Sequence, residues 1–264
     1  MGKIIKSNIK LVFLLTGVIF IFTVLLFSLT GCTSSASTDE NLLSDKIFEE
    51  LTYLENNIYD IVFKFANDDY IVNERNLNES LEENIDFQNI VTSIKVYDFD
   101  KVRNDLKKIN NSLDVTMVDL AEKSMERNEV ISLSNKANEL YMNLDEENIN
   151  VVLNDLNELE KVIIQNYESN FEENNNEIKL KRLKAEVLDV FILSQIYDDK
   201  TLGKEKINEV LSKFENEINN EEFIKENTYL VNNLYLNISE LKTAVDLEND
   251  SLIRLKYMEV VKSL

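Results

Sequence analysis

Residues 147–173 read ENINVVLNDLNELEKVIIQNYESNFEE, and the apolar side chains of this stretch recur at alternating intervals of three and four. The repeating positions are Ile149, Val152, Leu156, Leu159, Ile163 and Tyr167. Because an α-helix has about 3.6 residues per turn, this spacing places them all on one helical face and leaves the polar residues on the other. The stretch therefore predicts a surface helix that buries one seam against its neighbours.

The same spacing recurs on both sides of this stretch and predicts helices along most of the chain. The chain has no Pro, and Gly203 is the single Gly after Cys32, so little interrupts a helix. We expect helices at residues 42–67, 85–97, 100–126, 129–144, 147–173, 177–199, 203–219, 221–246 and 249–263. Short links make neighbouring helices antiparallel, so the sequence predicts an all-α fold, an elongated antiparallel bundle of about eight or nine helices.

The breaks between the apolar stripes carry residues that begin and end helices. Asp145 and Asn249 stand at positions where a side chain that accepts a backbone hydrogen bond favours a helix start. Gly203 stands where a left-handed residue is expected to end a helix. No flexible linker divides residues 42–264, which we interpret as one bundle domain, with a division near residue 145 as the alternative.

The first residues carry a different pattern. Lys3, Lys6 and Lys10 precede an uncharged and mostly apolar run, which ends in Leu29-Thr30-Gly31-Cys32 and a Ser- and Thr-rich segment. This leader resembles that of bacterial lipoprotein precursors, which have Leu, small residues and a Cys at the end of the apolar run. The resemblance implies that residues 1–31 are a signal peptide, that Cys32 carries a diacylglyceryl group, and that a palmitate-type lipid holds the chain outside the cell. Residues 32–41 would then be a flexible tether. A retained membrane-spanning helix and an ordinary secretory signal are the alternatives.

The charge of the chain restricts its partners. The formal net charge is −21, and removal of the leader takes away three lysines and no acid, so that the remaining chain carries −24. Anionic lipid heads and nucleic-acid phosphates repel such a chain. We therefore expect membrane attachment through the lipid on Cys32 and no binding of nucleic acid.

The composition also excludes several kinds of catalytic and cofactor site. The chain has no His, one Cys and four Gly. It therefore lacks the residues for a Ser-His-Asp system, an imidazole or thiolate metal site and a Gly-rich phosphate loop. The sequence indicates no catalytic residue, no metal site and no cofactor.

Three groups of polar residues are functional candidates. The first consists of adjacent acids, Glu49-Glu50, Asp68-Asp69, Glu82-Glu83, Glu146-Glu147, Glu172-Glu173, Asp198-Asp199 and Glu221-Glu222. Neighbours on a helix point about 100° apart and do not chelate together, so we interpret these acids as capping or solvated. The second group is the ten tyrosines, which we expect at the core edge with their hydroxyls in water. The third is Lys179, Lys181, Arg182 and Lys184, which we interpret as the charge counterpart of Glu172, Glu173 and Glu177 rather than a contact for an anionic partner.

These observations favour a non-catalytic role. Amphipathic helices offer long faces to partner helices, so we expect a lipid-anchored, extracytoplasmic module that binds another protein or helps to assemble an envelope complex. The alternative is a small-ligand or cation-binding lipoprotein associated with a membrane transporter. An enzyme that uses carboxylates or tyrosines is the third hypothesis.

Overall fold

The structure is a computed structural model, and it describes residues 36–72, 96–122, 127–144, 147–171, 176–197, 200–218 and 221–264. Contacts divide the chain into two units, Met1–Asp45 and Lys46–Leu264. The described part of the first unit is the beginning of helix α2 (Ala36–Ala66), which continues into the second. Cys32 and the rest of the lipoprotein-like leader lie outside the described residues.

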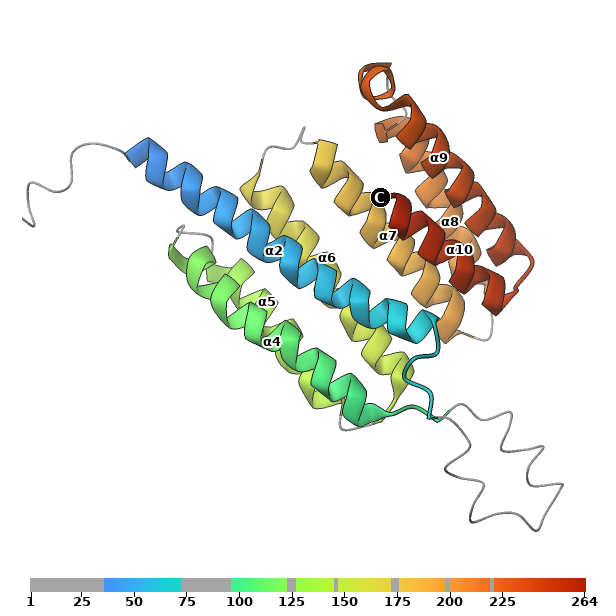
Figure 1. The fold of residues 1–264 in the computed structure, drawn as a ribbon, viewed down its shortest axis with the longest axis horizontal. Helices are drawn as coiled ribbons and strands as arrows, with labels where there is room; N and C mark the ends of the chain where they lie inside the picture. Colours follow the sequence, from blue (N-terminus) through green and yellow to red (C-terminus); the bar gives the residue numbers. More distant parts are fainter. Residues whose placement is uncertain are drawn as a thin grey trace, which may run out of the picture. The chain divides into compact units, whose positions relative to one another are not determined.

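The second unit is helical (Figure 1). After α2 come α4 (Phe99–Glu122), α5 (Arg127–Asn143), α6 (Ile149–Asn170), α7 (Asn176–Ile196), α8 (Thr201–Lys213), a π-helical turn (Phe214–Ile218), α9 (Glu221–Asp246) and α10 (Asp250–Ser263). Beside the helices, the described residues include one isolated antiparallel bridge, between Ile71 and Tyr97. The prediction of an all-α fold is confirmed.

Two predicted boundaries are wrong. Helix α2 begins at Ala36, so residues 36–41 are helical where a flexible tether was expected. Neither Gly nor Pro interrupts residues 36–66, and Asp39 and Glu40 favour the start of a helix through its dipole. The predicted helix at 85–97 lies mostly outside the described residues, but its end is extended, because Val96 accepts a backbone hydrogen bond from Val72 and Tyr97 bridges Ile71.

Helix α2 supplies fully buried side chains to the core. Ile47, Leu51, Leu54 and Ile58 are fully buried, as the helical stripe predicts. Side chains of α2 contact four other helices: Lys46 pairs with Asp119 of α4, Thr52 with Tyr167 of α6, Glu55 with Lys181 of α7, and Phe63 with Tyr257 of α10. Helix α2 thus joins parts of the chain that are far apart in sequence.

The other helices pack in chain order. Each helix from α4 to α9 packs on the next, and α10 packs on both α9 and α7. The starts of α6 and α10 are capped by Asn148 and Asn249, whose side chains accept hydrogen bonds from Asn150 N (3.1 Å) and Leu252 N (3.0 Å). The prediction for Asn249 is confirmed, while Asp145 lies outside the described residues. The compact unit includes both sides of residue 145.

Gly203 has a different role from the one expected. It lies in the first turn of α8 rather than after the end of α7, and its backbone is not left-handed. It is buried against Ser194 of α7, and a Cβ atom at position 203 would lie in steric conflict with Ser194 Oγ and 3.2 Å from Ser194 Cβ. Gly203 is therefore needed for the close approach of α8 to α7.

We expect Gly203→Ala to destabilise the protein by about 1–3 kcal/mol, because the added methyl group overpacks the contact with Ser194. Urea unfolding followed by circular dichroism measures this loss. In a Ser194→Ala background the same substitution is expected to cost less, since the conflicting hydroxyl is gone. An equal cost in both backgrounds would contradict the assigned contact.

Candidate functional site

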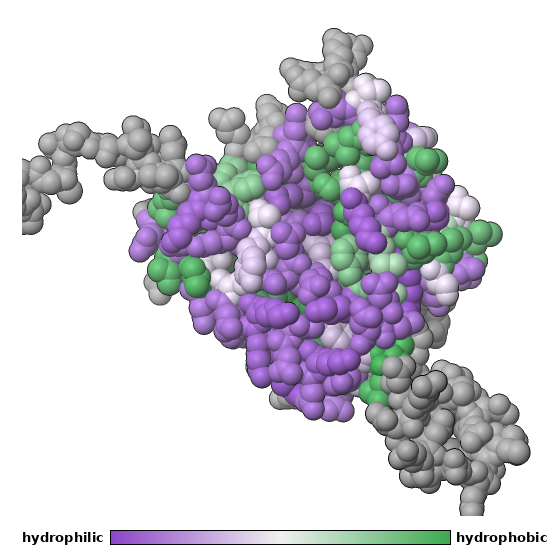
Figure 2. Space-filling view, viewed as in Figure 1, coloured by the Kyte–Doolittle hydropathy of each residue, from purple (hydrophilic) through white to green (hydrophobic). Residues whose placement is uncertain are grey.

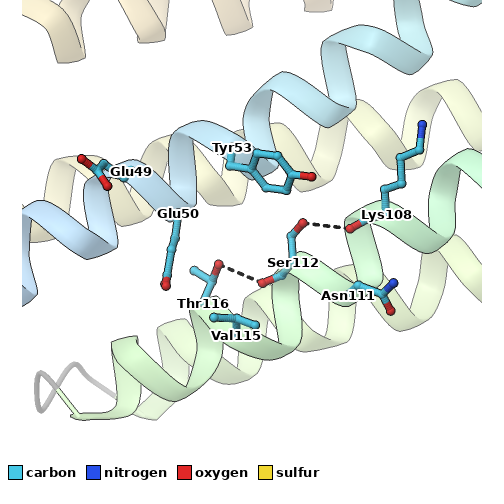
Figure 3. A pocket seen from close by; sticks show the side chains of 8 residues that line it. All are labelled: Glu49, Glu50, Tyr53, Lys108, Asn111, Ser112, Val115 and Thr116. Carbon is cyan, nitrogen blue, oxygen red and sulfur yellow. Dashed lines mark hydrogen bonds between the residues drawn. The ribbon is translucent and has the colours of Figure 1, made fainter.

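A hollow of the surface lies between α2 and α4, and we call it the α2–α4 groove. Its volume is about 570 Å³, and it lies open in Figure 3. The residues that line it are Glu49, Glu50 and Tyr53 from α2 and Lys108, Asn111, Ser112, Val115 and Thr116 from α4. Glu49-Glu50 is one of the adjacent acid pairs, and it lies well inside the predicted helix at residues 42–67.

Small side chains on α4 create this hollow. Ser112 and Thr116 face α2, and each hydroxyl donates a hydrogen bond to a carbonyl one turn back, to Lys108 O (2.8 Å) and Ser112 O (3.0 Å). Their polar atoms are thus paired within their own helix. The two side chains present little bulk to α2, which leaves space above them.

Apolar side chains lie at the rim of the groove. Tyr53 and Val115, which line the groove, are 59% and 53% exposed. Val118 does not line it but is 58% exposed one turn further along α4. The face shown in Figure 2 is mainly hydrophilic with separate apolar areas. Grouped exposed apolar side chains beside a hollow are typical of a binding surface.

One end of the groove is acidic. Glu50 points from α2 toward α4, where Lys46 Nζ lies 2.7 Å from Asp119 Oδ2 and 3.8 Å from Glu50 Oε1. Partial burial, together with hydrogen bonding to Asp119 and the charge of that carboxylate, raises the pKa of Glu50 to about 7. Glu50 Oε2 is enclosed and accepts no hydrogen bond within the described part of the chain. The carboxyl groups of Glu50 and Asp119 therefore share the single positive charge of Lys46.

A second polar site is buried between α2 and α7, and we call it the buried ion cluster. Glu55 is 1% exposed, and its two oxygens accept hydrogen bonds from Lys181 Nζ (2.7 Å) and Lys184 Nζ (2.9 Å). Lys181 Nζ also lies 4.8 Å from the ring centre of Tyr167, and Lys184 Nζ 3.8 Å from that of Tyr59. One carboxylate and the faces of aromatic rings thus hold both ammonium groups.

This cluster corrects the interpretation of the basic residues at the start of α7. We expected acids nearby in sequence to balance them, but the counterpart of Lys181 and Lys184 is Glu55, more than 120 residues earlier. Arg182 pairs with Glu168 (2.6 Å). Glu172 and Glu173 lie outside the described residues.

A second acid, Glu160 of α6, lies beside the buried ion cluster. It is fully buried, and neither of its oxygens accepts a hydrogen bond in the described part of the chain. Burial and the charge of Glu55 raise the pKa of Glu160 well above its ordinary range, although Lys184 and Lys181 oppose this shift. The neutral acid is therefore the favoured form of Glu160.

The tyrosines around this acid are also buried. Tyr59, Tyr167 and Tyr257 are almost completely enclosed, and burial raises the pKa of each hydroxyl. The expectation that tyrosine hydroxyls lie in water is wrong for these residues. It holds for Tyr53 and Tyr229, which are exposed.

Neither the described helices nor the described acids indicate a membrane span or a metal centre. No helix in the described ranges is both long and apolar enough to cross a bilayer. Among the same residues, no group of three His, Cys, Asp or Glu side chains is arranged to hold a metal ion.

Comparison with known proteins adds no family: no protein-family model matches the chain, and searches of curated proteins and of solved structures found no match either. The α2–α4 groove lies at the surface, with Tyr53 and Val115 exposed at its rim. The buried ion cluster is closed to solvent and serves the fold.

The burial of Glu160 predicts that stability depends on pH. A folded-state pKa above the unfolded value means that the folded chain binds more protons, so the free energy of unfolding falls as pH rises above the ordinary Glu range. The slope reaches about 1.4 kcal/mol per pH unit for one group. Glu160→Gln is expected to remove its contribution to this slope, while that of Glu50, whose pKa is raised to about 7, remains.

Urea unfolding at a series of pH values between about 5 and 9 measures the effect, over the range in which a raised Glu pKa acts. The matched control is Glu158→Gln, which changes a partly exposed acid on the same helix. It should leave the pH dependence unchanged. If Glu160→Gln and the wild type show the same dependence, the assigned protonation of Glu160 is wrong.

Proposed function

We propose that the protein is a lipid-anchored, extracytoplasmic helical module, an elongated antiparallel bundle that binds another protein or helps to assemble an envelope complex without catalysing a reaction. The observation that carries the proposal is the α2–α4 groove, where exposed Tyr53 and Val115 border a hollow of about 570 Å³. Exposed apolar side chains of this kind are stabilised when a partner removes them from water.

The chemistry of the groove supports binding rather than catalysis. The hydroxyls of Ser112 and Thr116 are occupied by carbonyls of their own helix, and no base contacts them among the described residues. Asp119 is held by Lys46. No nucleophile with a neighbouring base is therefore assembled among the residues that line the groove.

The leader supports the anchor. Lys3, Lys6 and Lys10, the apolar run and Leu29-Thr30-Gly31-Cys32 together have the order found in bacterial lipoprotein precursors. Two acyl chains give a stable hold on a membrane, whereas one is marginal. A chain with a net charge of −24 is repelled by anionic lipid heads, so the anchored helical body would remain accessible to partners.

The anchor proposal predicts that Cys32→Ala abolishes lipid attachment, because no other thiol is present in the chain. Cells grown with an alkyne analogue of palmitate should label the wild type but not the variant, and the variant should keep its leader. The matched control is Cys32→Ala combined with Ser34→Cys, which restores a thiol two residues away and should stay unlabelled. Normal cleavage and labelling of Cys32→Ala would refute the anchor.

The binding proposal predicts that a photo-crosslinking amino acid at Val115 captures a specific protein on intact cells. The same amino acid at Leu202, an apolar position on α8 that is 46% exposed against 53% for Val115, is the control and should not capture that protein. Tyr53→Ala should reduce capture at Val115, because it removes an apolar side of the groove. Equal capture at Val115 and Leu202, or capture at neither position, would contradict the assignment of the groove.

A further inference from the structure

We propose that the occupant of the α2–α4 groove is an amphipathic helix of the partner protein, with an apolar side chain between Tyr53 and Val115 and with Lys or Arg side chains toward Glu49 and Glu50. This inference rests on the proposed function and names the chemistry of its partner. It is carried by the shape of the groove and by the charges at its ends.

The shape of the groove suits a helix. Two helices form its sides, and the small residues Ser112 and Thr116 lie between them (Figure 3). Val115 and Val118 are exposed at a spacing of about one turn on α4, and Tyr53 stands on the opposite side. Apolar residues at intervals of three and four on a partner helix meet such positions in successive turns.

The charges make one end of the groove attractive to basic side chains. Glu49 and Glu50 line this end, and Asp119 and Glu122 of α4 act on the same Lys46. Lys46 binds Asp119 more closely than Glu50, and its side chain is 56% exposed. Three carboxyl groups, those of Asp119, Glu50 and Glu122, thus act on the one ammonium group of Lys46, and the negative charge left over favours an added cation.

The opposite end of the groove carries a base that is already balanced. Lys108 lies there, and its Nζ is paired with Asp105 Oδ1 (2.9 Å). One end of the groove is therefore negative and the other is not, and this difference orients a basic partner helix along the groove. A second copy of this chain is disfavoured as the occupant, because each copy without its leader carries a net charge of −24.

The test uses a fluorescein-labelled synthetic helix of Leu and Lys, about 14 residues and so roughly 20 Å long. Its binding to the full protein in nanodiscs of neutral phosphatidylcholine is measured by fluorescence anisotropy, with empty nanodiscs as the blank. One control peptide carries Glu in place of every Lys. A second has the same composition in an order that forms no apolar face.

The expected result is that the Leu–Lys helix binds and both control peptides do not. At about pH 8, where Glu50 with its pKa of about 7 is ionised, Glu49→Gln combined with Glu50→Gln should weaken binding about tenfold, the effect of losing two charge pairs. Tyr53→Ser should also weaken it. The matched control is Glu205→Gln combined with Glu215→Gln, which makes the same charge change at exposed positions away from the groove and should change binding by less than about twofold.

Two results would overturn the inference: equal weakening by the two double charge variants, or binding of the peptide without an apolar face as tight as that of the Leu–Lys helix. Binding would then be general electrostatic attraction. Crosslinking at Val115 separates this failure from that of the proposed function. Capture of a partner through an acidic or non-helical segment overturns the inference alone. Capture of a second copy, or of another segment of the same chain, overturns both.

Discussion

The buried ion cluster is the constraint on which the placement of α2 depends. Glu55 is enclosed in the core, and two lysines of α7 supply the hydrogen bonds and the opposite charge that its carboxylate needs. Burying such a group is costly unless it is fully paired, so any position of α2 that separates Glu55 from Lys181 and Lys184 is strongly disfavoured. Apolar packing brings the helices together, while this cluster selects one register for α2.

The same register determines the α2–α4 groove. Tyr53 lies two residues before Glu55, and residues two apart on a helix point about 200° from one another. Anchoring Glu55 in the core therefore directs Tyr53 outward, where it is 59% exposed at the rim of the groove. Glu49 precedes Tyr53 by one turn on the same face. The buried carboxylate of Glu55 and the proposed binding surface thus lie on opposite sides of α2.

The helices could be predicted from the sequence because they depend on local spacing. The stripe of α6, from Val152 to Tyr167, is buried as expected. The positions that bring helices together could not be predicted, because they depend on residues distant in sequence. Glu55 stands in an acidic and Asn-rich stretch typical of a solvated face, and nothing nearby indicates that its partners lie on α7. Gly203 likewise gains its role from Ser194 on another helix.

The burial of Glu160 could have been predicted from the sequence. Glu160 continues a second apolar line on α6, formed with Leu153, Leu156 and Ile164, all of which are buried. An acid in such a line predicts an enclosed carboxyl group. The groove is harder to predict from the sequence. Ser112 and Thr116 fit the helical pattern of α4, and their small size has a consequence only because α2 lies beside them.

The most direct test of this account is a mutant cycle across the buried ion cluster, measured by urea unfolding. Glu55→Leu alone should cost about 3–5 kcal/mol, because it leaves two enclosed ammonium groups without their carboxylate. Adding Lys181→Met and Lys184→Met removes those unpaired charges, so the account predicts that the triple variant is more stable than Glu55→Leu. If instead the costs of the separate changes add to within about 0.5 kcal/mol, the two sides of the cluster are independent and α2 is not held as described.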